Sequence, residues 1–214
     1  WRTRLSNSLY FRPLVRVGDE QFIAGTRQFD ASVKYNLTLL NEGLYPARST
    51  KMKQSMERAR GRYTRGFENE VAEHIDSHPD WKAKSGFKKG GFGMPEPLGD
   101  FDALALHKSG RFLVIECKAY ATTIGPRRIS SEWKAIYRGI NGGKGDLAKH
   151  ENRVEWARDN LAALSKELSW DLDYAQVDGF FVTEKPTPSR VWGKEQVPVM
   201  SFQELQICLE DELP

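Results

Sequence analysis

The chain has 214 residues, a formal net charge of +3, and 39% hydrophobic and 29% charged residues. This composition indicates a globular protein and excludes an intrinsically disordered one. No apolar run approaches the ~20 residues needed to cross a bilayer, and no signal-peptide pattern opens the sequence, so we expect a cytoplasmic protein without a membrane partner. The chain begins at Trp1 rather than Met, and we expect a piece of a longer protein with further domains.

The sequence pattern predicts an N-terminal extension of mixed α and β structure over residues 1–55 and a main domain over residues 56–214. Apolar residues on both sides of Gly18-Asp19 predict a hairpin within residues 13–24. Apolar residues at helical spacing follow over about residues 31–42, and Pro46 breaks this pattern.

A long helix is predicted from Thr50 to His78, with Pro79 as its stop and Gly61 or Gly66 as points of interruption. Its buried stripe should consist of apolar residues at helical spacing, namely Phe67, Val71, Ala72 and Ile75. Residues 81–87 follow as a candidate strand. A basic, glycine-rich loop with Lys88 and Lys89 comes next.

Two apolar runs of strand length, residues 103–106 and 112–115, predict a β-hairpin that carries unexplained charges. Side chains two apart on a strand share a face, so Glu116 and Lys118 should point the same way. If the two strands pair, Asp102 can lie beside Glu116. Cys117 alternates with both neighbours, and we expect it to be a core residue on the opposite face.

Charged residues in this position need partners, because they are seldom fully buried unless they are paired or bind a metal. Two converging carboxylates repel each other unless a proton or a cation lies between them, and hard oxygen ligands suit Mg²⁺ or Mn²⁺. An adjacent ammonium can hold an attacking water or stabilise a phosphate oxygen. The hairpin therefore suits phosphodiester hydrolysis.

The remaining chain predicts a helical stretch around residues 131–138, a helix over 146–168, strands over 177–183 and 197–200, and a last helix over 202–209. The order of helix, three strands, helix, two strands and helix predicts one sheet flanked by helices. The buried positions expected in the helix over 146–168 are Leu147, Val154, Ala157, Leu161 and Leu164. The histidines are expected on the surface or on helix faces: His74, His78, His107 and His150.

From about Arg65 to Leu209 the chain resembles the PD-(D/E)XK nuclease superfamily. The segment Gly66-Phe67-Glu68-Asn69-Glu70-Val71-Ala72-Glu73-His74-Ile75 is similar to the first helix of Mrr-type restriction enzymes and archaeal Holliday-junction resolvases. Asp102-Ala103-Leu104-Ala105 and Val114-Ile115-Glu116-Cys117-Lys118 are similar to their central hairpin. The resemblance implies an α/β, restriction-endonuclease-like fold, a mixed sheet flanked by helices with an αβββαββ core.

The resemblance also implies roles for individual residues. Asp102 and Glu116 would be ligands of Mg²⁺ or Mn²⁺ together with the backbone carbonyl of Cys117. Lys118 would stand at the attacking water or scissile phosphate, and Glu68 would be an auxiliary ligand or would contact a metal-bound water. Asp100 remains an alternative to Asp102, which we prefer because the apolar strand follows it directly. Glu70 likewise remains an alternative to Glu68. Gly99 stands where some members of the superfamily have Pro.

The implied function is a metal-dependent endonuclease acting on DNA, as part of a larger restriction, phage-defence or repair protein. The alternatives are a non-catalytic nucleic-acid-binding or interaction module on the same fold, and a nuclease for RNA or branched DNA; a homodimer is compatible with each. Basic residues expected to contact phosphates are Lys88, Lys89, Arg127, Arg128, Lys134 and Lys144. Tyr137, Lys149 and Arg153 are further candidates to line a nucleic-acid groove.

Overall fold

The computed structural model describes residues 15–17, 19–41, 45–88, 92–120, 126–139, 143–188, 190 and 197–210, with the backbone alone given for 15, 97 and 126–128. The chain divides into two compact units, residues 1–63 and 64–214. This boundary lies inside a helix, whereas the sequence prediction places it after residue 55. No helix in the described ranges has the length and apolarity that a bilayer span requires.

The first unit contains the expected hairpin and helix. Strands β1 (Val15–Arg16) and β2 (Phe22–Ile23) pair in antiparallel fashion, with Val15 opposite Ile23. Helix α1 (Thr26–Asn41) follows and begins five residues earlier than the apolar spacing predicts. Helix α2 (Thr50–Asp76) continues without a break through Gly61 and Gly66, so neither glycine interrupts it.

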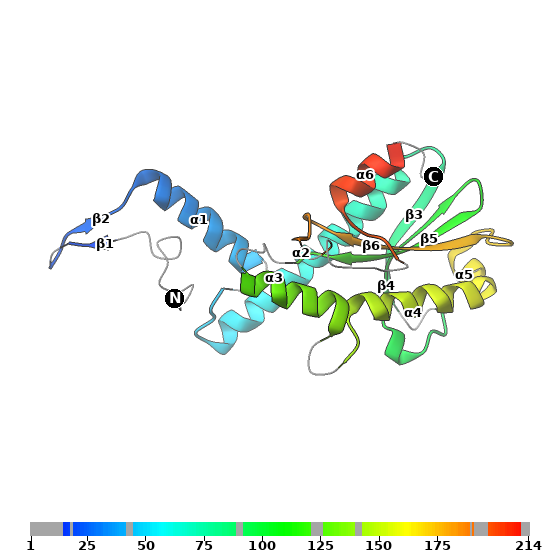
Figure 1. Ribbon diagram of the computed structural model, residues 1–214, viewed down its shortest axis with the longest axis horizontal. Helices are drawn as coiled ribbons and strands as arrows, with labels where there is room; N and C mark the ends of the chain where they lie inside the picture. Colours follow the sequence, from blue (N-terminus) through cyan, green and yellow to red (C-terminus); the bar gives the residue numbers. More distant parts are fainter. Residues whose placement is uncertain are drawn as a thin grey trace. The chain divides into compact units, whose positions relative to one another are not determined.

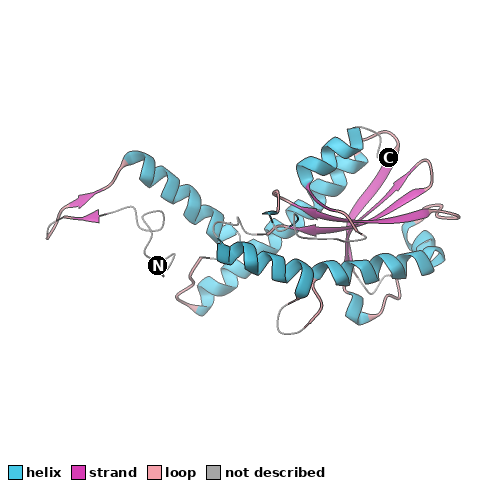
Figure 2. Ribbon diagram, in the orientation of Figure 1, coloured by secondary structure: helices cyan, strands magenta, loops and turns pink. Residues whose placement is uncertain are grey.

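The second unit is built on a mixed five-stranded sheet in the order β3-β4-β5-β6-β7 (Figure 2). Its strands are β3 (Trp81–Phe87), β4 (Phe101–His107), β5 (Arg111–Lys118), β6 (Gln176–Thr183) and β7 (Val199–Ser201). The pairs β3–β4 and β4–β5 are antiparallel, whereas β5–β6 and β6–β7 are parallel. The predicted hairpin is therefore present, and β5 is the central strand of the sheet.

Helices cover both faces of this sheet, as Figure 1 shows. On one face, residues 67–75 of α2 and helix α6 (Phe202–Glu210) pack against the odd-numbered apolar residues of β5, such as Leu113 and Ile115. On the other face, helices α4 (Asp146–Asp159) and α5 (Leu161–Leu168) pack against its even-numbered residues, such as Phe112 and Val114. The predicted α2 stripe is buried on the first face.

Two helical predictions need correction. The helix expected over 146–168 is divided at Asn160, whose φ of −126° leaves the helical range and whose side chain donates a hydrogen bond to the Trp156 carbonyl. The stretch expected around 131–138 consists of α3 (Pro126–Trp133) and a π-helical turn, η4 (Lys134–Arg138). A short 3₁₀ turn, η3 (Glu96–Leu98), leads into β4.

The N-terminus of α6 is fixed by reciprocal hydrogen bonds at the end of β7. The Ser201 backbone N–H donates to the Glu204 carboxylate at 2.8 Å, and the Glu204 backbone N–H donates to the Ser201 hydroxyl at 3.3 Å. These bonds satisfy donors that a helix start leaves without intrahelical partners. They fix where β7 ends and α6 begins.

Helix α4 approaches β6 most closely at Gly179. A Cβ atom at this position would lie 2.5 Å from Val154 Cγ2 and 3.1 Å from Val197 Cγ2. Both separations are shorter than normal van der Waals contact, so only glycine allows the helix to pack at this distance from the strand. The placement of α4 over the sheet therefore depends on residue 179.

We expect Gly179→Ala to destabilise the chain by about 1–3 kcal/mol, because the added methyl group overpacks the α4–β6 contact. Val154→Ala should restore part of this loss in the double variant, since it removes the methyl group that the new Cβ would meet. Urea unfolding measures both effects. The matched control is Gly66→Ala in α2, where a Cβ meets nothing within 4 Å; it should be neutral or stabilising by up to about 1 kcal/mol. Equal losses in both alanine variants would contradict this account.

Candidate active site

The hairpin brings three charged residues together at one end of β4 and β5. Ala103 pairs with Ile115 across the two antiparallel strands, so Asp102 and Glu116 occupy the next position on each strand. Asp102 lies two residues before Leu104, and Glu116 and Lys118 follow Val114 at intervals of two, which places all of them on the face that α4 covers. The predicted neighbours therefore share one face.

Direct contacts connect these side chains. The Lys118 ammonium forms an ion pair with Glu116 Oε1 and lies 3.7 Å from Asp102 Oδ2. The backbone N–H of Cys117 donates a hydrogen bond of 2.9 Å to the same Asp102 oxygen. Lys118 thus lies where a cation can offset two carboxylates, while the backbone of β5 orients Asp102.

Glu116 is only 3% exposed and has a second cationic partner, which lies on α4. The guanidinium of Arg153, on α4, forms an ion pair with Glu116 Oε2. Arg153 is itself 7% exposed, so its predicted place in an open nucleic-acid groove is wrong. Its side chain is needed inside, because a buried carboxylate requires compensating charge.

His150 lies on α4 and is fully buried, so of the two predicted positions, the surface or a helix face, it occupies a helix face that is buried. Burial lowers its pKa to about 4, so the imidazole is neutral at physiological pH. The charge of Glu116 acts on this ring, which also packs edge-on against Phe181. A signal for His150 and Arg153 was present in the sequence, because both fall on the same stripe of α4 as Leu147, Val154 and Ala157.

The electrostatics of the cluster differ between its members. Burial, followed by the charge of Glu116, raises the pKa of Asp102 to about 7. Burial also acts to raise the pKa of Glu116, but the charges of Lys118 and Arg153 outweigh it and the net pKa is lowered. For Lys118, burial acts to lower the pKa, and the two carboxylates more than reverse this. Lys118 is therefore cationic and Glu116 anionic, whereas Asp102 exchanges its proton near neutral pH.

Glu68 on α2 approaches the cluster from the other layer of the sheet. Burial raises the pKa of Glu68, the charge of Lys118 acts to lower it, and the charge of Glu116 acts to raise it, so burial is the main cause of the net increase. Glu70 is exposed, and its charge acts on His74 instead. Asp100 is also exposed, whereas Asp102 contacts Lys118. Of the two pairs of alternatives, Glu68 and Asp102 are the residues nearer the cluster.

The donors that could hold a metal are oxygen atoms of Asp102 and Glu116. The described residues contain no group of three or more His, Cys, Asp or Glu side chains arranged around one metal position. Mg²⁺ is commonly held by one or two carboxylates together with substrate phosphates, so this pair fits it in donor chemistry. Because N–H and C=O of one strand residue point toward the same neighbouring strand, the Cys117 carbonyl faces β4, where Asp102 lies. The Cys117 side chain is in the opposite core, as predicted.

The residues predicted to contact phosphates are only partly described. Four of them are exposed, and none of the four forms an ion pair with Asp102 or Glu116: Lys88, Lys134, Lys144 and Lys149. Lys149 instead forms an ion pair of 3.2 Å with Asp146. Lys89 and the side chains of Arg127 and Arg128 lie outside the described residues.

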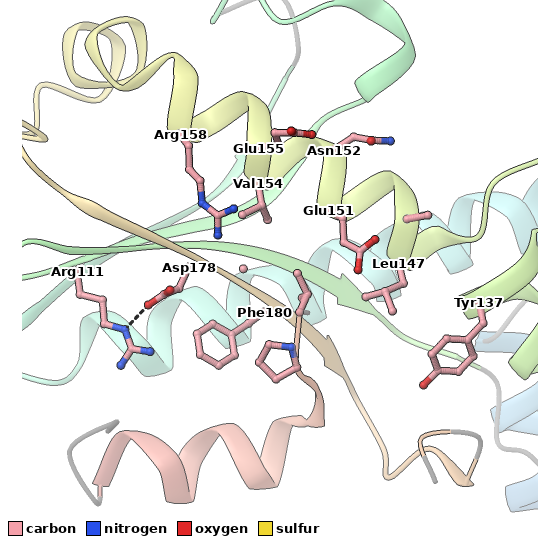
Figure 3. A pocket seen from close by; sticks show the side chains of 14 residues that line it. Arg111, Tyr137, Leu147, Glu151, Asn152, Val154, Glu155, Arg158, Asp178 and Phe180 are labelled. Atoms are coloured by element: carbon pink, nitrogen blue, oxygen red, sulfur yellow. Dashed lines mark hydrogen bonds and ion pairs between the residues drawn. The ribbon is translucent and has the colours of Figure 1, made fainter. Parts of the chain in front are cut away.

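A cavity of about 600 Å³ lies on another side of α4, and Figure 3 shows its lining. It is bounded by residues of α4 and β6 that include Glu151, Glu155 and Asp178; Asp102, Glu116 and Lys118 do not line it. Both of its arginines have partners of their own: Arg111 pairs with Asp178 at 2.6 Å, and Arg158 donates to the Val177 carbonyl. We therefore place the candidate site at the carboxylates, whose charges interact with one another, and not in this cavity.

Comparisons of the chain with protein-family models, curated proteins and solved structures found no match in any of the three.

The raised pKa of Asp102 predicts a pH dependence of stability in EDTA. A carboxyl group whose folded pKa exceeds its unfolded pKa contributes stability that is present at low pH and lost as pH rises through the folded value, here about 7. The native chain should therefore lose stability between about pH 4 and about pH 7 relative to Asp102→Asn, which carries no titrating proton at this site.

Urea unfolding at several pH values measures this difference, with Asp100→Asn as the exposed control that keeps the native profile. Parallel profiles for the native chain and Asp102→Asn would show that Asp102 titrates normally.

Proposed function

We propose that this chain is a metal-dependent endonuclease domain that hydrolyses phosphodiester bonds of DNA. The observation that supports this proposal is the convergence of Asp102, Glu116 and Lys118 at one end of β4 and β5. The order of the strands and helices agrees with a restriction-endonuclease-like fold, which we propose on the same grounds. By that resemblance the domain would serve a larger restriction, defence or repair protein.

The proposed reaction divides the work among the chain's own residues. Asp102 and Glu116 would hold Mg²⁺ or Mn²⁺ with the Cys117 carbonyl, and the ion would supply Lewis-acid stabilisation and a water of lowered pKa. Lys118 keeps its positive charge and would stabilise negative charge that develops on the phosphate. Glu68, at the margin of the cluster, would orient a water molecule. The exposed lysines would add contacts to the DNA backbone.

One feature favours this proposal over a non-catalytic module: both carboxylates and the lysine are present, and their side chains lie next to one another. A module that had lost the chemistry would not need to keep two carboxylates and a lysine in a largely buried cluster, because such groups are costly to desolvate. Glu116 and Lys118 have exposed side-chain fractions of 4% and 29%. Catalysis explains why these charges are kept there.

We expect Asp102→Asn, Glu116→Gln and Lys118→Met each to lower metal-dependent cleavage by about 100-fold or more, because each removes several kcal/mol of charge stabilisation. The assay measures cleavage of supercoiled plasmid, linear duplex, branched DNA, single-stranded DNA and RNA, each in the presence of Mg²⁺, Mn²⁺ or EDTA. The substrate that is cut separates the DNase from the RNase and branched-DNA alternatives.

Glu70→Gln is the matched control, because Glu70 is exposed on the helix that carries Glu68; it should cut like the native chain. Cleavage that persists in EDTA or in all three site variants would refute the proposal. Binding of nucleic acid by a folded chain that cuts no substrate would favour the binding module.

A further inference from the structure

Helix α4 presents a buried cation to the candidate site from outside the hairpin. Arg153 is 37 residues away from Glu116 in the chain, yet their side chains form a buried ion pair. Arginine is almost never fully buried without a partner, so this contact accounts for its position inside the protein. None of the residues assigned to the chemistry above lies on α4.

The same guanidinium makes a second bond, to the turn that leads into the other strand of the hairpin. Arg153 Nη1 donates to the Leu98 backbone carbonyl at 3.0 Å, while Nη2 contacts Glu116. Leu98 closes the turn that leads into β4, four residues before Asp102. One planar group thus connects the start of the strand carrying Asp102 to the carboxylate of Glu116, a geometry that the arginine fork provides and a lysine does not.

The backbone next to this bond is adapted to the guanidinium. Gly99 has φ of +81°, a conformation that L side chains rarely adopt, and a Cβ at this position would lie 3.3 Å from Arg153 Nη1. Proline, with φ fixed near −65°, could not take this conformation. Gly99 therefore leaves room for Arg153 to reach the Leu98 carbonyl.

Arg153 and Lys118 contact different oxygens of Glu116. Arg153 occupies Oε2, whereas Oε1 faces Lys118 on the side of Asp102. We infer that Arg153 is a positioning residue, which holds Glu116 so that Oε1 alone is directed toward a divalent cation shared with Asp102. This inference rests on the proposed function and adds to it the group that orients one of the two ligands.

The test is Mn²⁺ binding to the full chain without nucleic acid, measured by calorimetry. Arg153→Lys keeps the charge but loses the fork, and Arg153→Met removes the charge. Loss of a group that orients a metal ligand typically costs about 10- to 100-fold in affinity, and we expect weakening in this range, with the larger loss in Arg153→Met. The concentration of Mn²⁺ that gives half-maximal cleavage should rise in parallel, while KM for DNA at saturating Mn²⁺ stays unchanged.

Arg158→Lys and Arg158→Met are the matched controls. Arg158 lies on the same helix and, among the described residues, donates to the Val177 carbonyl alone, at 3.1 and 3.2 Å, so its replacement perturbs α4 without touching Glu116. These controls should bind Mn²⁺ with native affinity. A change in Mn²⁺ affinity without a change in KM for DNA indicates that Arg153 positions a metal ligand. A general loss of folded protein would instead lower both the binding heat and the cleavage rate.

Native affinity in folded Arg153→Lys and Arg153→Met would overturn the inference, as would equal losses in the Arg153 and Arg158 variants. Failure of both Arg153 variants to fold would mark the residue as structural and overturn it too. If the native chain itself neither binds Mn²⁺ nor cuts, the proposed function fails as a whole. Native binding with unaffected Arg153 variants refutes only the positioning role.

Discussion

The buried carboxylate of Glu116 is the constraint on which the surrounding structure depends. Removing a carboxylate from water costs several kcal/mol even after the protein relaxes, and the loss is recovered only with well-placed partners. Here the partners are Lys118 from the same strand and Arg153 from the helix above it. The sheet, α4 and the turn before β4 must therefore be held in one arrangement for this charge to remain inside.

The packing of α4 at Gly179 and the ion pair of Arg153 with Glu116 both require the same distance between α4 and the sheet. Because Gly179 has no side chain, Val154 can lie against β6 at this position. Arg153 directly precedes Val154 in the helix. A helix that approached less closely would withdraw its guanidinium from the hairpin. The apolar contact and the ion pair are thus coupled, since each fixes the height of α4 above the sheet.

Much of the second unit could be predicted because its signals are local. Alternation along 103–118 specifies the hairpin, its face and the neighbours Asp102 and Glu116, and glycine and polar residues specify the turn. Asn160 was passed over because the apolar spacing continues on both sides of the break. His150 and Arg153 were missed because a periodicity argument assigns burial to apolar residues, and the partner that allows a buried arginine lies far away in sequence.

The topology around β5 also has a consequence for the order in which the site forms. The β4–β5 hairpin closes over a few residues, whereas the paired residues of β5 and β6, such as Arg111 and Gln176, are 65 positions apart in the sequence. Short loops close faster and with less entropy loss than long ones, so we expect the two carboxylates to meet early in folding, before α4 docks. Until α4 docks, Glu116 would be hydrated and would have Lys118 alone as its charge partner. We therefore expect this charge to become buried only when the crossover between β5 and β6 is completed.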